Sequence, residues 1–95
     1  MDAELNAYRA RIDSIDDIIL ELLNRRLKYA LEINQIKLEK GQQVLDAERE
    51  QRILARLHGY NEGPLSPAGL ERIYRTIIGE SRRLMQQSRG AAEQE

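Results

Sequence analysis

The chain of 95 residues has no cysteine and only one histidine, His58. These absences exclude disulfide bonds, thiol catalysis and a zinc site built from cysteine and histidine, and they permit a reducing cytoplasm. The chain does not open with a basic segment followed by an apolar one, and it contains no run of about 18 apolar residues. We therefore expect a cytoplasmic protein that does not associate with membranes.

An excess of charge of one sign is also missing, because 15 basic and 16 acidic residues give a net charge of −1. Acidic and basic residues alternate along the chain instead of segregating, so no basic patch for nucleic acid is expected. Aromatic residues are few, with four tyrosines, no Phe and no Trp. Charged residues make up 33% and hydrophobic residues 41% of the chain, which favours a folded, charge-rich helical domain over a disordered one.

Glycine and proline are absent from residues 1–40, although both occur later in the chain. Within this segment apolar side chains recur at alternating steps of three and four, the pattern of a long helix that packs against other helices. We predict a first helix over about residues 3–40, with Asp2 as its N-cap and Gly41 as its C-terminal stop. The apolar stripe of this helix consists of Leu5, Tyr8, Ile12, Ile15, Ile19, Leu22, Tyr29, Ile33 and Ile36.

Two shorter helices are expected in the rest of the chain. Asp46 is a good N-cap and is followed by acidic residues, which the helix dipole favours in a first turn, so a second helix is predicted over about residues 46–59. Ser66 followed by Pro67 is typical of an N-cap and a first helical position, which predicts a third helix over about residues 67–88.

The expected fold is all-α, with one helical domain over residues 1–88 and a disordered tail over residues 89–95. A helix of about 38 residues is about 57 Å long, whereas a compact domain of this size has a radius of gyration near 12 Å. The first helix therefore extends beyond any single-chain globule and exposes its apolar stripe. We expect an intertwined homodimer in which the first helices pair antiparallel.

Arg26 occupies a position in this stripe, between Leu22 and Tyr29. A buried guanidinium without an anionic partner is unfavourable, so either a glutamate of another helix or an anionic ligand should meet it. Lys37 lies on the same side of the helix about 16 Å further along, a gap that holds a small anionic molecule. Arg9 lies about 25 Å away in the other direction. In an antiparallel dimer the partner subunit's Arg9 could instead reach the region of Arg26.

Each of these residues also has a purely structural interpretation. Arg9 and Lys37 are, taken alone, typical solvated surface residues. Asp46 with Glu50 is typical of an N-cap and a first turn that matches the helix dipole. Composition and spacing alone therefore leave the existence of a ligand site open.

Three segments of the chain carry a more specific signal, and they read YRARIDSIDDIILELLNRR, IKLEKGQQVLDAEREQRIL and IYRTIIGESRRL. Together they resemble the all-helical class of chorismate mutases, which occur as single enzymes and as N-terminal domains of prephenate dehydratases. The resemblance runs from about residue 5 to 86. Its specific features are the pairs Ile12-Asp13 and Ile15-Asp16 after Arg9, the spacing of Arg26 eleven residues before Lys37, and the D-x-x-R-E motif from Asp46 to Glu50. The resemblance implies an intertwined homodimer with two sites, each of which takes one arginine from the other chain.

The resemblance further implies that the chain converts chorismate into prephenate, in phenylalanine and tyrosine biosynthesis, by a Claisen rearrangement. Arg26 and the partner subunit's Arg9 would grip the two carboxylates of chorismate. Lys37 would donate to the ether oxygen, and Glu50 would accept from the ring hydroxyl. This reaction requires no nucleophile, metal or cofactor, but a compact diaxial conformer and stabilisation of charge on the ether oxygen. The expected catalytic residues are Arg26, Lys37 and Glu50, and the further substrate-binding residues are Arg9, Asp46, Arg49, Ser81 and Met85.

One position departs from the family pattern. Four residues after Ser81, which is expected to hydrogen-bond a carboxylate, the family usually has Gln or Glu, and this chain has Met85. A thioether cannot donate to the ether oxygen, and Gln86 points about 100° away around the helix. We expect either a weakened mutase or a local rearrangement that brings Gln86 inward, with Arg82 and Arg83 outside the pocket.

Three other functions stay open on the sequence alone. An isochorismate pyruvate lyase would use the same fold and a similar cationic pocket. A weakly active or regulatory mutase-like domain would fit the methionine at position 85. A plain helical dimerisation module would use the apolar stripe without any ligand.

Overall fold

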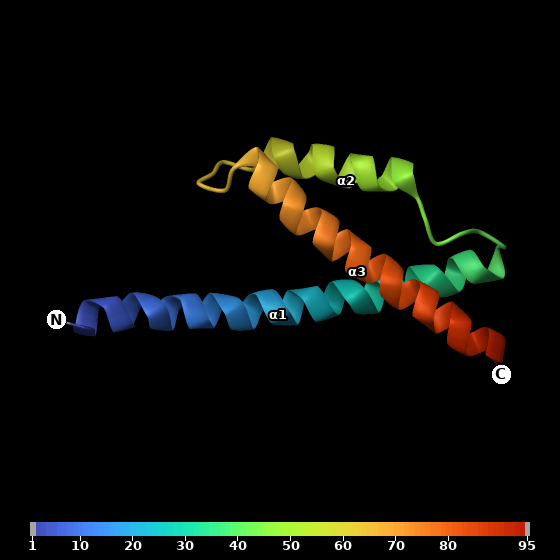
Figure 1. Ribbon diagram of the computed structural model, residues 1–95, viewed down its shortest axis with the longest axis horizontal. Coiled ribbons are helices and arrows are strands. Elements are labelled where there is room, and N and C mark those ends of the chain that lie inside the picture. The colour runs from blue at the N-terminus through green and yellow to red at the C-terminus, as the bar shows by residue number, and fades with distance from the viewer. Residues whose placement is uncertain (1, 95) are drawn as a thin grey trace.

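The computed structural model describes the backbone of residues 2–94 and the side chains of residues 2–91. The chain folds into three helices, α1 (Asp2–Glu39), α2 (Ala47–Tyr60) and α3 (Pro67–Gln94), which Figure 1 shows in this order. No strand is found in the described part of the chain, so the predicted all-α class is confirmed. None of these three helices is long and apolar enough to cross a membrane.

The C-terminal end of α1 is set by Gly41, as its sequence position predicts. Gly41 has a φ of 69°, a left-handed conformation that glycine adopts without steric cost. Its N–H donates to the Leu38 carbonyl at 3.2 Å, and the N–H of Gln42 donates to the Lys37 carbonyl at 2.8 Å. This pair of bonds is a Schellman motif, which satisfies the last carbonyls of the helix and turns the chain toward α2.

Two of the three predicted N-caps, Asp46 and Ser66, are confirmed, whereas Asp2 is itself the first described residue of α1 and not its cap. The Asp46 carboxylate accepts from the N–H of Arg49 at 2.9 Å at the start of α2. The Ser66 hydroxyl accepts from the N–H of Gly69 at 3.0 Å at the start of α3. Each cap satisfies an N–H that has no partner within its own helix.

The C-terminal end of α3 lies at Gln94, not near residue 88 as expected. Residues 89–94 therefore continue the helix where a disordered tail was predicted, and Glu95 lies outside the described residues. Gly90 is the only poor helix former in this stretch, and one glycine weakens a helix by about 1 kcal/mol without ending it. The N–H of the Arg89 guanidinium (Nε) also donates to the Asn34 side chain at 2.8 Å, which ties this turn to α1.

Helix α3 is the element that holds the chain together. It crosses the C-terminal half of α1 and packs on α2, whereas in the described residues no Cα atom of α1 lies within 8 Å of a Cα atom of α2. The N-terminal half of α1 projects away from both other helices (Figure 1). The chain consequently measures 59 × 31 × 15 Å and has a radius of gyration of 17.3 Å, against about 12 Å for a compact domain of this length.

The apolar stripe predicted for α1 stays largely exposed within one chain. Ile12, Ile15 and Leu22 are each more than half exposed, at 56%, 54% and 51%. The face of α1 that α3 covers is a different one, which carries Ala30 and Asn34 as its buried residues. The stripe is therefore available for a contact outside the chain.

Asn34 joins α1 to the C-terminal part of α3. It is 3% exposed. Its amide nitrogen donates to the Met85 carbonyl at 3.2 Å, and its amide oxygen accepts the bond from Arg89. A buried amide that satisfies groups on the facing helix fixes the crossing point of the two helices.

We predict that Asn34→Ala lowers the free energy of unfolding by about 2 kcal/mol, because it leaves the Met85 carbonyl and the Arg89 Nε without their partner. Urea denaturation at a fixed protein concentration measures this change. Gln35→Ala is the matched control, because Gln35 is exposed and donates only to Glu39. Equal unfolding free energies for the two variants would show that Asn34 does not hold the crossing.

Candidate active site

A pocket of about 290 Å³ lies where α1 and α2 are separated and α3 spans the gap between them. Its walls combine charged side chains from all three helices with an apolar lining. The apolar part consists of Tyr29, Ala30, Ile33, Val44, Ile53, Ile78 and Met85. The polar part consists of Arg26 and Lys37 from α1, Asp46, Arg49 and Glu50 from the start of α2, and Ser81 and Arg82 from α3.

Seven of the eight residues expected at the site therefore lie around one pocket. They come from positions up to 59 residues apart, between Arg26 and Met85. The eighth, Arg9, lies on the projecting half of α1 and is exposed, about 25 Å from Arg26 along the helix. Its predicted contribution to the site of a partner chain stays a prediction.

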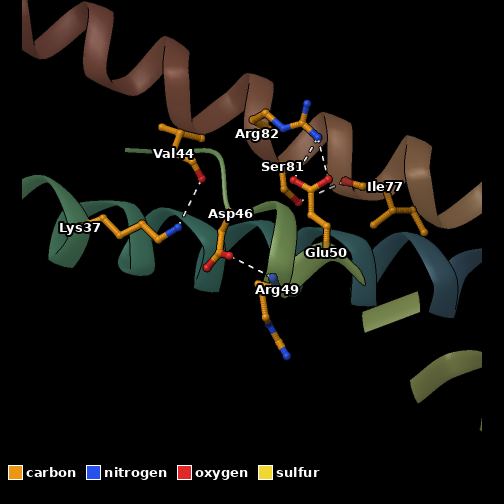
Figure 2. A network of polar contacts seen from close by, with 8 residues as sticks. All are labelled: Lys37, Val44, Asp46, Arg49, Glu50, Ile77, Ser81 and Arg82. Atoms are coloured by element: carbon orange, nitrogen blue, oxygen red, sulfur yellow. Dashed lines mark hydrogen bonds and ion pairs between the residues drawn. The ribbon is translucent and has the colours of Figure 1, made fainter. Parts of the chain in front are cut away.

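The two cations of α1 are held by polar groups that carry no charge. One terminal nitrogen of Arg26 (Nη1) donates to the Ser81 hydroxyl at 2.8 Å. The Lys37 ammonium donates to the Val44 carbonyl at 3.3 Å, as the dashed line in Figure 2 shows. Within residues 2–91, Arg26, Lys37 and Arg49 form no ion pair with a carboxylate. Three cationic side chains therefore line this pocket without an anionic partner among the described side chains.

The start of α2 supplies two carboxylates that are bound differently. Asp46 accepts the capping bond from the Arg49 backbone, so its orientation follows from the helix start. Glu50, one turn later, points toward α3 and accepts from one terminal nitrogen of Arg82 at 3.0 and 3.1 Å to its two oxygens (Figure 2). The Glu50 side chain is 24% exposed and that of Arg82 is 36% exposed.

The expectation that Arg82 lies outside the pocket is wrong. Ser81 precedes Arg82 by one residue and faces inward, but the long arginine side chain reaches around the helix to Glu50. No spacing rule within one helix could predict this, because the partner lies on another helix. Arg83 does lie outside, where it pairs with Glu80 and lowers the pKa of that carboxyl through a hydrogen bond.

Ser81 and Met85 form the α3 wall of the pocket. Ser81 is 7% exposed and donates to the Ile77 carbonyl at 3.2 Å while it accepts from Arg26. Met85 is 6% exposed and lines the pocket, whereas Gln86 is exposed and does not. The rearrangement that would bring Gln86 inward is therefore not seen, and the apolar methionine side chain occupies this position.

The lining carries four basic and two acidic side chains, a formal excess of two positive charges. A pocket of this size and charge suits a small dianion. The class of protein is thus an all-α domain with a pocket of net positive lining between its helices.

Comparison with known proteins names the family. Residues 8–86 match the sequence profile of chorismate mutase type II, so the chain belongs to this family. It is 36% identical over 80 residues to a bifunctional chorismate mutase/prephenate dehydratase of Neisseria gonorrhoeae, covering 84% of this chain and 22% of that protein. It is 38% identical over 79 residues to a protein of the same description from Aquifex aeolicus, covering 79% of this chain and 22% of that protein.

A third relative is the T-protein of Enterobacter agglomerans, which is 35% identical over 82 residues, covering 85% of this chain and 22% of that protein. The chain spans about a fifth of the length of the curated relatives that it matches. The predicted resemblance to the all-helical chorismate mutases is confirmed.

Proposed function

We propose that the chain is a chorismate mutase that rearranges chorismate to prephenate, in phenylalanine and tyrosine biosynthesis in the cytoplasm. Family membership supports this reaction. The observation that carries it is the set of three cations, Arg26, Lys37 and Arg49, which line a pocket of about 290 Å³ without a carboxylate partner in residues 2–91. Chorismate, with two carboxylates, supplies the missing negative charge.

The proposed role of each polar residue follows from its position in the pocket lining. Arg26 binds one carboxylate of chorismate through its planar guanidinium, with Ser81 as a second donor to that group. Lys37 exchanges its bond with the Val44 carbonyl for one with the ether oxygen. Arg49 adds to the positive wall, and Glu50 accepts from the ring hydroxyl, near Asp46.

The chemistry needs only these contacts. The rearrangement breaks a C–O bond as it forms a C–C bond within one molecule, so binding the compact diaxial conformer removes much of the entropic barrier. Negative charge grows on the ether oxygen in the transition state, and a positioned ammonium stabilises it. Lys37, Arg26 and Glu50 are therefore the proposed catalytic residues.

Purified protein is expected to convert chorismate into prephenate, and Arg26→Ala is expected to lower kcat/KM by about 100-fold or more because a carboxylate loses its cation. Loss of chorismate absorbance and the appearance of prephenate measure both. Arg25→Ala is the matched control, because Arg25 is the neighbouring arginine, is exposed and does not line the pocket. An unchanged rate in Arg26→Ala would contradict the proposed site.

Release of salicylate and pyruvate from isochorismate, with no prephenate from chorismate, would instead identify a lyase.

We also propose an intertwined homodimer in which the partner subunit's Arg9 binds the second carboxylate. The exposed stripe on α1 supports this assembly, because its isoleucines, leucines and tyrosines lie open to water in a single chain. The N-terminal half of α1 projects away from α2 and α3 (Figure 1), which leaves it accessible to another chain. An antiparallel pairing of two such helices brings position 9 of one chain toward position 26 of the other.

Mixing two inactive variants tests this assembly. Arg9→Ala and Arg26→Ala are each expected to be inactive, yet refolding them together in equal amounts restores roughly a quarter of the wild-type activity, because half of the dimers are mixed and each has one intact site of two. Arg26→Ala mixed with Lys37→Ala is the control, since both residues line the pocket of the same chain and no intact site forms. Equal recovery in both mixtures, or none in the first, would contradict a shared site.

Met85→Gln is expected to raise kcat, by up to about 10²–10³, because it adds a donor near the breaking bond that the thioether lacks. Met85→Leu is the matched control, which keeps the volume and adds no donor, and its kcat should stay within about twofold. A Met85→Gln rate no better than wild type would show that position 85 does not contact the ether oxygen. Tight chorismate binding without turnover in the wild type, relieved by Met85→Gln, would identify a regulatory domain.

A further inference from the structure

The Arg82–Glu50 pair is a direct bond between α2 and α3 at the pocket wall. One terminal nitrogen of Arg82 (Nη2) contacts both oxygens of the carboxylate, at 3.0 and 3.1 Å. Both side chains line the pocket, and three-quarters of the Glu50 side chain is covered. The Nε of Arg82 is buried and has no hydrogen-bond partner in the described residues. The contact with Glu50 is therefore the polar interaction that orients this guanidinium.

Glu50 presents an electrostatic problem in a pocket for a dianion. A partly buried carboxylate repels a bound carboxylate more strongly than an exposed one does, because less water screens it. The other charged and polar groups that line the pocket with Glu50 are Arg26 and Lys37 on α1, Asp46 and Arg49 at the start of α2, and Ser81 and Arg82 on α3. Of these, Arg82 is the one that forms an ion pair with Glu50.

We propose that Arg82 is a positioning residue, which neutralises Glu50 and holds its carboxylate in the orientation that accepts the ring hydroxyl of the substrate. This inference rests on the proposed mutase function. Arg82 acts through Glu50 and not on the reacting atoms. Without Arg82, the formal charge of the pocket lining falls from two positive to one positive, and the Glu50 side chain loses its anchor on α3.

The two parts of this role are separable by substitution. Arg82→Met keeps an unbranched apolar stem at this position and removes both the charge and the contact. Arg82→Lys keeps the charge but replaces the planar guanidinium, whose Nη2 contacts both carboxylate oxygens, by a shorter and freely rotating ammonium that does not fix their orientation. Arg83→Met is the matched control, because Arg83 is the next residue, is exposed and pairs with Glu80 away from the pocket.

Steady-state kinetics on chorismate measures the effect, with circular dichroism to compare helix content. Arg82→Met is expected to lower kcat/KM roughly 10- to 100-fold, the size expected when a contacting group is misplaced by about 1 Å, with KM raised and kcat lowered. Arg82→Lys is expected to restore KM and to leave kcat low. Arg83→Met is expected to match the wild type. If Arg82→Met does not fold, the low kcat of Arg82→Lys carries the test.

A double-mutant cycle separates positioning from direct contact with the substrate. In a Glu50→Gln background, Arg82→Met is expected to change kcat/KM less than about threefold, because the carboxylate on which Arg82 acts is gone. The same fold-loss in both backgrounds would mean that Arg82 contacts the substrate itself, and would overturn the inference. The inference is also overturned if the enzyme is active and Arg82→Met turns over chorismate at the same rate as Arg83→Met. That result would leave the proposed mutase function intact. A wild-type protein that does not turn over chorismate overturns both.

Discussion

The crossing of α3 over α1 is the contact on which the rest of the structure depends. The backbones of α1 and α2 stay more than 8 Å apart at every Cα pair in the described residues, so the packing of α3 on both helices helps to set the width of the pocket. Asn34 fixes this crossing from inside, because its buried amide bonds the Met85 carbonyl and the Arg89 side chain. Met85 therefore has two roles, since its backbone locks the helices and its side chain lines the pocket.

The C-terminal end of α1 and the N-terminal end of α2 each have a structural role and also line the pocket. The Schellman motif at Gly41 places Lys37 on the last turn of α1, and the following loop offers it the Val44 carbonyl. The cap at Asp46 begins α2 after this loop, and Glu50, one turn later, points toward α3. Local hydrogen bonds that any helix of this kind needs thus also place the charged groups of the site. Such placement by local hydrogen bonds suits the proposed rearrangement, which is catalysed by positioned charges.

The long helix α1 contributes both to the pocket and to the exposed apolar stripe. Its C-terminal half packs on α3 and carries Arg26 and Lys37, whereas the apolar stripe stays exposed along the helix. An extended chain with a radius of gyration of 17.3 Å cannot bury that stripe alone. Because α1 extends beyond the rest of its own chain, it would carry Arg9 toward the pocket of a second chain. Assembly and substrate binding are therefore proposed to depend on this one helix.

Local chemistry in the sequence was sufficient for the helices, the caps at Asp46 and Ser66, the stop at Gly41 and the grouping of seven site residues. These features follow from periodicity, short-range hydrogen bonds and a family motif, all of which can be recognised in the order of residues along the chain. The length of α3, the buried bond of Asn34 with Arg89, and the pairing of Arg82 with Glu50 were not predictable in this way. Each depends on which side chains two helices bring face to face, and that is decided by packing between residues more than 30 positions apart, because no local spacing encodes it.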